Sequence, residues 1–319
     1  MKNLFKIENT PHKGLLTVEW LILGYLVLTT LWILFAYTKI QNPESLLWGR
    51  ARVVVITAAM WGVYRMAPCK FTHLCRISAQ LLLLPWWYPD TYELNKILPN
   101  LDHLFASWEQ QFFGCHPALL FSETIDNPVF AELMHLGYAS YFPLIATVTL
   151  FYFFWRYTEF SRTVFVILGS FFLYYVVFVF LPVTGPQYYY AAVGLNDIAQ
   201  GIFPNLHDYF ATHTEALPMP GNSNGFFYQC VASAHEAGER PTAAFPSSHV
   251  GITTILLFLA WRTKNRLLFY GIIPFYVLMC MATVYIRAHY AIDVIGGWVS
   301  AIVFYTLLQS FWTYTKRRY

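Results

Sequence analysis

Charged residues are scarce in this chain. Asp, Glu, Lys and Arg together make up only 12% of its 319 residues, which is about half the share usual for soluble domains. Hydrophobic residues make up 57% and aromatic residues 19%. This balance argues against a soluble protein with an oversized core and favours a chain that is embedded in a membrane.

Several chemical signals are also missing. The net charge is only +3, and no cluster of Lys and Arg indicates nucleic-acid binding. No spacing of His, Cys, Asp or Glu is typical of a metal site, so we expect no metal and no other cofactor. There are five cysteines. Two of them, Cys115 and Cys230, fall in predicted outer segments, and the sequence leaves open whether they pair.

Apolar runs recur along most of the chain. About 20 residues are needed to cross a hydrocarbon core of ~30 Å, and each crossing must be helical because lipid offers the backbone no hydrogen-bond partners. We therefore predict an all-α polytopic transmembrane bundle of about eight spans, with six to eight compatible with the pattern. The third, from Leu74 to Trp87, is short, and whether it crosses fully is left open. The predicted spans are 18–37, 51–66, 74–87, 129–155, 163–181, 247–261, 267–286 and 290–312.

Basic residues are distributed unevenly between the two sides of this bundle. With the N-terminus inside, most of the twenty Lys and Arg residues fall on that face, which predicts cytoplasmic N- and C-termini. The lack of sorting and glycosylation signals favours a bacterial inner membrane. We expect a single membrane domain, with N-terminal helices in 1–88 and a catalytic region in 89–319. The oligomeric state is not predicted.

The segment FPSSHVG, Phe245 to Gly251, opens the sixth predicted span. Pro246, Ser247 and Ser248 are residues that favour the first positions of a helix. The free N–H groups at a helix start favour an anion, so a phosphate could dock here beside His249.

The segment RAHYAIDVIGG, Arg287 to Gly297, opens the eighth predicted span. Asp293 follows His289 by four residues, which places both on one face of a helix. An Asp bonded to one imidazole nitrogen leaves the other nitrogen basic, as a nucleophilic His requires. The alternation of spans brings His249 and His289 to the same, outer membrane face. A chance His–Asp spacing is the plainer alternative, but ionisable pairs near a membrane helix usually mark function.

Other polar and aromatic residues on the outer side have simpler interpretations. Tyr188 to Tyr190 are expected to form an interfacial aromatic belt rather than to contact substrate. Five histidines are expected to be solvated loop residues: His103, His116, His207, His213 and His235.

The two histidine segments resemble signatures of the type 2 phosphatidic acid phosphatase superfamily. FPSSHVG is similar to its Pro-Ser-x-His signature, and His289 to Asp293 is similar to its His-x-x-x-Asp signature. The His-Tyr-x-x-Asp form resembles the branch of inositol phosphorylceramide and sphingomyelin synthases. The segments 98–121 and 181–189 also resemble the inositol phosphorylceramide synthase branch, so the similarity spans about 98–298.

The resemblance implies a fold and a mechanism. It implies a helical core of the superfamily type, in which His289 is phosphorylated, Asp293 orients it and His249 protonates the leaving group. His249 would then activate the acceptor, which is water in a phosphatase and a lipid hydroxyl in a transferase. The residues expected to bind the substrate phosphate are Arg240, Ser247, Ser248 and Arg287.

Two departures from the phosphatase pattern bear on the reaction. The phosphatases carry a Lys seven residues before the Arg of an Arg-Pro pair, where this chain has Ser233. They also carry an Arg shortly before the third-signature His, where this chain has Thr283. A phosphomonoester dianion demands more positive charge than a phosphodiester. The missing cations favour transfer of a phosphoryl head group over hydrolysis.

Three functions follow, in order of preference. The first is an enzyme that transfers an inositol phosphate-like head group from a phospholipid to a ceramide-like acceptor. The second is a phosphatase of phosphatidic acid or an isoprenyl pyrophosphate that uses the same histidines. The third is a transporter in which His and Asp relay protons, although the broken, repeated helices typical of transporters are not evident. In each case the partners are membrane lipids or water.

Overall fold

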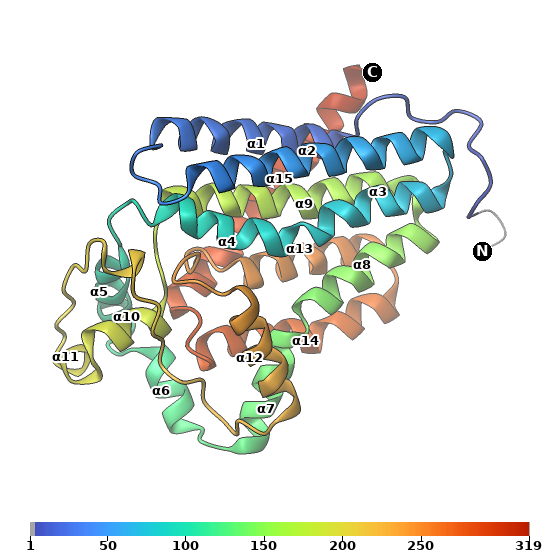
Figure 1. The fold of residues 1–319 in the computed structure, drawn as a ribbon. Coiled ribbons are helices and arrows are strands. Elements are labelled where there is room, and N and C mark those ends of the chain that lie inside the picture. The colour runs from blue at the N-terminus through green and yellow to red at the C-terminus, as the bar shows by residue number, and fades with distance from the viewer. Residues whose placement is uncertain (1–3, 319) are drawn as a thin grey trace.

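The computed structural model describes residues 4–318 and is all-helical over that range. Its long helices lie alongside one another, while short helices gather at one end (Figure 1). The α-helices are α1 (Thr17–Phe35), α2 (Pro43–Met66), α3 (Lys70–Leu82), α4 (Leu84–Asn95), α5 (Asp102–Phe113), α6 (Pro117–Thr124), α7 (Pro128–Ala139), α8 (Tyr141–Trp155), α9 (Tyr157–Phe180), α10 (Pro186–Val193), α11 (Leu195–Ala199), α12 (Phe226–Gly238), α13 (Ser248–Arg262), α14 (Arg266–Tyr285) and α15 (Ala291–Arg318), and a short 3-10 helix covers Tyr209–Ala211.

Five of the described helices, α1, α2, α9, α14 and α15, are long and apolar enough to cross a membrane. The pair α7–α8, which is bent by 44° around Ser140, passes the same test only when its two helices are taken together, and it counts as a sixth crossing if they form one span. The all-α polytopic bundle is confirmed, and its five or six spans lie at or below the lower end of the predicted range. Two of the eight predicted spans do not meet this criterion of length and composition.

Two predicted spans account for the difference. The stretch from Leu74 to Trp87 is divided between α3 and α4, which have only 13 and 12 residues and meet at Leu83. Pro85 lies in the first turn of α4, where a proline readily starts a new helix. The sixth predicted span is α13, which has 15 residues and is shorter than the ~20 that a full crossing needs.

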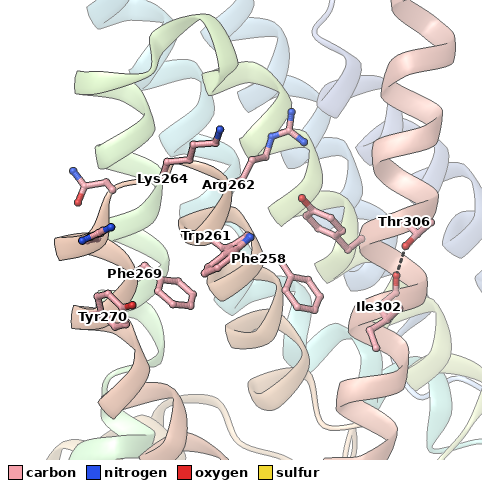
Figure 2. Close-up of a pocket in the computed structure, with 11 residues that line it drawn as sticks. Phe258, Trp261, Arg262, Lys264, Phe269, Tyr270, Ile302 and Thr306 are labelled. Atoms are coloured by element: carbon pink, nitrogen blue, oxygen red, sulfur yellow. Dashed lines mark hydrogen bonds between the residues drawn. The ribbon is translucent and has the colours of Figure 1, made fainter.

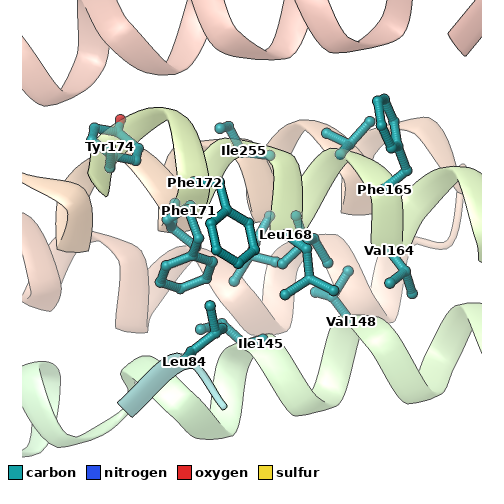
Figure 3. Close-up of a cluster of buried hydrophobic side chains, with 14 of the residues drawn as sticks. Leu84, Ile145, Val148, Val164, Phe165, Leu168, Phe171, Phe172, Tyr174 and Ile255 are labelled. Carbon is teal, nitrogen blue, oxygen red and sulfur yellow. The ribbon is translucent and has the colours of Figure 1, made fainter. Parts of the chain in front are cut away.

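Helix α9 lies at the centre of the bundle. Most of its apolar window, 78%, is buried inside the protein, as expected for a helix that is hydrophobic all round. Figure 3 shows Phe171 and Phe172 of α9 among side chains of α8 and α13, including Ile145 and Ile255. The helices that carry the chemistry-bearing residues therefore pack on a rigid apolar core.

Two buried ion pairs hold the N-terminal helices together. Arg50 of α2 binds Asp90 of α4 with an N–O distance of 2.9 Å, and Arg76 of α3 binds Glu19 of α1. All four side chains are almost completely buried. The pairing satisfies charges that would be costly in an apolar interior.

The structure tests several expectations for the segments that the sequence predicts to lie on the outer side. Tyr189 and Tyr190 are fully buried in a second apolar cluster, so they do not form an interfacial belt. His116 is buried too, and its Nδ1 lies 2.7 Å from the hydroxyl of Tyr190. Cys115 and Cys230, whose pairing the sequence left open, are unpaired.

Candidate active site

His289 lies in the short connection between α14 and α15. Its Nδ1 is 2.8 Å from the carbonyl oxygen of Ala244. A carbonyl can only accept a hydrogen bond, so Nδ1 must carry the proton and donate it. The lone pair of the neutral ring is therefore on Nε2, which is the nitrogen a nucleophile needs.

Asp293 lies in the first turn of α15 and is completely buried. Its Oδ2 is 3.5 Å from Nδ1 of His289 and accepts a 2.8 Å hydrogen bond from the backbone N–H of Tyr290. This bond caps the start of α15. The sequence interpretation made Asp293 the group that orients His289, but the Ala244 carbonyl is the closer partner of that ring. Asp293 adds a buried carboxyl group beside it.

His249 lies in the first turn of α13 and is clamped between two tyrosines. The ring centroid of Tyr138 is 4.5 Å from that of His249, and the centroid of Tyr141 is 4.4 Å away. The bend at Ser140 between α7 and α8 separates these two tyrosines and lets both reach the imidazole. The ring of His249 lies 5.7 Å from that of His289, centroid to centroid.

Small residues bring α13 and α15 close enough for the two histidines to meet. A Cβ added to Gly251 of α13 would first meet the Tyr174 hydroxyl of α9, and would lie 3.2 Å from the carbonyl oxygen of Gly297 of α15. A Cβ on Gly297 would lie 2.8 Å from the carbonyl oxygen of Ser247. The backbone N–H of Ser247 also donates a 3.0 Å bond to the carbonyl of Asp293. The glycines in the two motifs therefore set the spacing between the helices.

The predicted phosphate-binding serines lie at the start of α13. Ser247 is buried, and its hydroxyl accepts from the backbone N–H of Val250 at 3.4 Å as the N-cap. Ser248 is half-buried, and its carbonyl accepts from the Tyr141 hydroxyl at 3.4 Å. Both stand next to His249, at a helix end that favours anions.

The predicted phosphate-binding arginines are held by other groups. Arg240 is exposed and donates to the carbonyl of Glu239 at 2.7 Å. Arg287 donates to the Ser122 hydroxyl at 3.1 Å and to the Pro218 carbonyl at 3.3 Å. None of the contacts that the structure gives for either guanidinium involves a histidine of the site.

Two basic residues from elsewhere in the chain, Arg50 and Lys96, do not replace the positive charge of these arginines at the site. Arg50 is engaged by Asp90, and Lys96 forms a 2.8 Å ion pair with Glu93. Thr283, at the position where the phosphatases carry Arg, is buried and accepts the backbone N–H of His289 through its carbonyl. Among residues 4–318, no hydrogen bond or ion pair joins a Lys or Arg side chain to His249, His289 or Asp293.

A carboxylate stands near the two histidines instead. Glu239 accepts a 2.8 Å hydrogen bond from Gln187, and its other oxygen lies 2.8 Å from Nε2 of His235. Burial raises the pKa of Glu239, but His235 and Gln187 outweigh that effect and hold it below its usual range. Burial lowers the pKa of His289 to about 4, while the Ala244 carbonyl and Glu239 oppose that shift. Glu239 thus brings negative charge to the site.

Two acidic residues of α5, Asp102 and Glu109, contact residues at the start of α15. Asp102 is fully buried and accepts from the Tyr290 hydroxyl at 3.0 Å, from the Thr184 backbone at 2.7 Å and from the Gly185 backbone at 2.9 Å. Glu109 is also buried, and its Oε2 lies 3.4 Å from the backbone nitrogen of Ile292. These contacts fix the residues that flank His289.

Sequence reasoning missed several parts of this site. The clamp by Tyr138 and Tyr141, the Ala244 carbonyl and the Glu239 carboxylate come from segments with no recognised motif. Two supporting segments did carry a signal through their resemblance to known synthases: 98–121, which contains Asp102, and 181–189, which contains Gln187. The described residues contain no group of three or more His, Cys, Asp or Glu side chains that could hold a metal ion.

Comparison with known protein families agrees with this geometry. Residues 103–307 match the PAP2 superfamily, the type 2 phosphatidic acid phosphatase superfamily. The match covers well over half of the chain and includes both histidine motifs, so the protein belongs to this superfamily. Membership implies an enzyme with phosphatase or phosphotransferase activity on lipid phosphates in the bilayer. No curated protein and no solved structure matches the chain.

Proposed function

We propose that the protein is a lipid phosphotransferase that works through a phosphohistidine on His289. The observation that carries this proposal is the hydrogen bond from Nδ1 of His289 to the Ala244 carbonyl, with the ring of His249 5.7 Å away. It leaves Nε2 of His289 as the nucleophile and places a second titratable imidazole beside it.

The proposed reaction has two steps. In the first, Nε2 of His289 attacks the phosphorus of the donor, the bond from phosphorus to the lipid oxygen breaks, and protonated His249 gives its proton to that oxygen. In the second, neutral His249 takes the proton of the acceptor hydroxyl, whose oxygen attacks the phosphohistidine and releases His289. The proton thus returns to His249. Ser247, Ser248 and the start of α13 bind the phosphate in both steps.

The charges at the site support a phosphodiester donor. A phosphomonoester dianion needs strong cationic stabilisation, but Arg240 and Arg287 are bonded elsewhere and Glu239 is ionised nearby. A phosphodiester carries one negative charge and is repelled less. We therefore propose transfer of an inositol phosphate-like head group from a phospholipid to a ceramide-like acceptor, as in the synthases whose motifs these segments resemble.

We also propose where this chemistry takes place. The bias of basic residues supports cytoplasmic termini and a site at the outer face of a bacterial inner membrane. The family match at 103–307 lies within the proposed catalytic region 89–319. Labelling of a single cysteine introduced at exposed Asn224, with a membrane-impermeant reagent applied to intact cells, tests this orientation.

A transfer assay tests the reaction. Purified protein is given head-group-labelled phosphatidylinositol with and without ceramide. Ceramide-dependent formation of a labelled sphingolipid supports the proposal. Release of inorganic phosphate from phosphatidic acid, without transfer, would instead make the protein a phosphatase, and no turnover of either donor would overturn both.

A trapping experiment tests the two histidine roles. Each protein is supplied with a nitrophenyl phosphodiester that is labelled in its phosphoryl group and whose leaving group needs no proton. After alkaline denaturation, which preserves phosphohistidine, the wild type and His249→Ala should both retain this label. His289→Ala should retain none. His213→Ala, which alters an exposed histidine, is the matched control and should behave as wild type. Full labelling of His289→Ala would contradict the mechanism.

A further inference from the structure

A large cavity lies at the end of α13 that is remote from His249. It has a volume of about 870 Å³, within the range of ligand-binding pockets. Its lining comes from α13, the turn after it, α14 and α15 (Figure 2). Because α14 and α15 both pack on α13 but little on each other, α13 forms the floor and the other two helices form the walls. The lining residues are Phe258, Trp261, Arg262, Lys264, Asn265, Arg266, Phe269, Tyr270, Ile302, Tyr305 and Thr306.

The polarity of this cavity changes from one end to the other. Figure 2 shows Arg262 and Lys264 along one edge, with Trp261, Phe258 and Phe269 beneath them. The cations cluster at the turn between α13 and α14. The aromatic and aliphatic side chains follow the helices away from this turn.

The cations at this edge exceed the acidic groups that neutralise them. Arg262 forms a 3.4 Å ion pair with Glu159. Lys264 and Arg266 take part in no ion pair with the described residues. At least two positive charges are therefore available to an anion.

Lys264 stands where a glycine would be easier to accommodate. Its φ is 57°, in the left-handed region that commonly ends a helix and favours Gly. A lysine there adds charge at a cost in backbone strain.

The cavity opens towards lipid. Trp261 is 68% exposed, Tyr270 63% and Ile302 56%, and the last two belong to α14 and α15, which are candidate membrane spans. Exposed aromatic residues beside basic residues at helix ends are typical of the membrane interface. A soluble anion would use the charged edge but leave this apolar surface without a partner.

We propose that this cavity binds an anionic phospholipid from the leaflet at that end. Its phosphate lies against Lys264, Arg266 and Arg262, and an acyl chain follows Phe258 and Ile302 between α14 and α15. The cavity is separate from the candidate active site, because the 13 residues from His249 to Arg262 span roughly 20 Å along α13. The proposal does not depend on the proposed reaction.

Native mass spectrometry of the full chain tests this site, with phosphatidylglycerol and phosphatidylcholine as probes. Wild type should retain phosphatidylglycerol in preference to phosphatidylcholine. The double variant Lys264→Gly with Arg266→Gln should lose that preference by roughly tenfold or more. Since Lys264→Gly also relieves the backbone, the loss should occur without a fall in thermal stability.

Matched variants make the result specific. Lys13→Gln with Arg65→Gln removes two charges at exposed positions outside the cavity and should keep the preference. Ile302→Ser should weaken lipid retention, whereas Val299→Ser, at an exposed apolar position of α15 outside the lining, should not. Equal retention by the cavity and control charge variants overturns the proposal. So does displacement of the lipid by inorganic phosphate, which would show an anion site without an acyl-chain site.

Discussion

Glu109 lies beside the start of α15 in an environment that opposes its ionisation. Its side chain is fully buried, and one of its oxygens has no hydrogen-bond partner among the described residues. Burial, reinforced by nearby Asp293, raises the pKa of Glu109 from 4.5 to about 8. The neutral acid is thus the native form over most of the physiological range.

This shift predicts a pH-dependent effect of Glu109→Gln. The unfolded chain ionises above pH 4.5 but the native protein only near pH 8. The stability contributed by Glu109 is therefore complete below pH 4.5 and is lost as pH rises to about 8. Glutamine does not ionise, so the melting temperature of the variant relative to wild type should rise by ~5 °C between these limits. Glu236→Gln, at an exposed site, is the control, and its melting temperature relative to wild type should not change with pH. The same constancy in Glu109→Gln would contradict the prediction.

The low pKa of His289 predicts a broad acid tolerance. A nucleophilic His289 must be neutral, and it stays neutral down to about pH 4 rather than to the ~6.5 of an ordinary histidine. With a nitrophenyl phosphodiester donor, the acid limb of kcat/KM should therefore have its midpoint near pH 4. Glu239→Gln removes a charge that raises this pKa and should move the midpoint lower. A midpoint at the ordinary value would refute the assignment.

At the scale of helices, the approach of α13 to α15 decides whether the two histidines meet. In Gly297→Ala the new Cβ would lie 2.8 Å from the Ser247 carbonyl oxygen and 3.1 Å from Cβ of Val250. The helices must move apart, which should cost ~1–3 kcal/mol of stability and lower kcat with both histidines intact.

A second glycine supplies the control. Gly271 lies in α14, and a Cβ added there would meet no neighbouring atom within 4 Å. Gly271→Ala should therefore leave kcat unchanged and stabilise by up to ~1 kcal/mol. Thermal unfolding and single-turnover rates distinguish the two variants. Equal behaviour would show that helix spacing does not govern the chemistry.

The sequence predicted those helices and motifs whose signals are local. His249 and the pair His289 and Asp293 are predicted as site residues because their spacing and helix-start residues lie within a few positions. The Ala244 carbonyl was not found, since every residue has a backbone carbonyl and only the fold aims this one. Tyr138 was missed because it reaches His249 through the bend of another span.

The number of membrane spans is harder to predict from the sequence than the local motifs are. Hydropathy locates apolar runs but does not show where a helix breaks, so it does not predict that the run from Leu74 to Trp87 divides into two helices at Leu83. The run that forms α13 is apolar because its neighbours α8, α9, α14 and α15 surround it. Its 15 residues are fewer than a full crossing needs. An apolar helix buried by its neighbours and one facing lipid have similar compositions.

At the scale of the whole molecule, helices α1–α4 precede the family match and depend on buried charge. Asp90→Leu would leave Arg50 buried without its partner, which should cost ~3–5 kcal/mol. Replacing both with leucine should restore most of this loss, because no charge remains to be desolvated. Thermal unfolding of the purified variants measures the effect.

The partly exposed pair of Lys96 and Glu93 is the control for that prediction. Glu93→Gln should cost at most ~1 kcal/mol, as surface ion pairs usually do. If Asp90→Leu were as mild, or if the double replacement were no better than the single one, the buried pair would not hold α2 to α4 in the way proposed.

Asp102 connects parts of the chain that are made at very different times. Its carboxylate binds Thr184 and Gly185 and also Tyr290, which is 188 residues further on. During synthesis, Asp102 leaves the ribosome long before the neighbour of His289 exists. The two histidines cannot be held in place until α15 has entered the membrane, so an unfinished chain carries no assembled site. A chain that stops short of Tyr290 therefore lacks the hydrogen bond from that hydroxyl to Asp102.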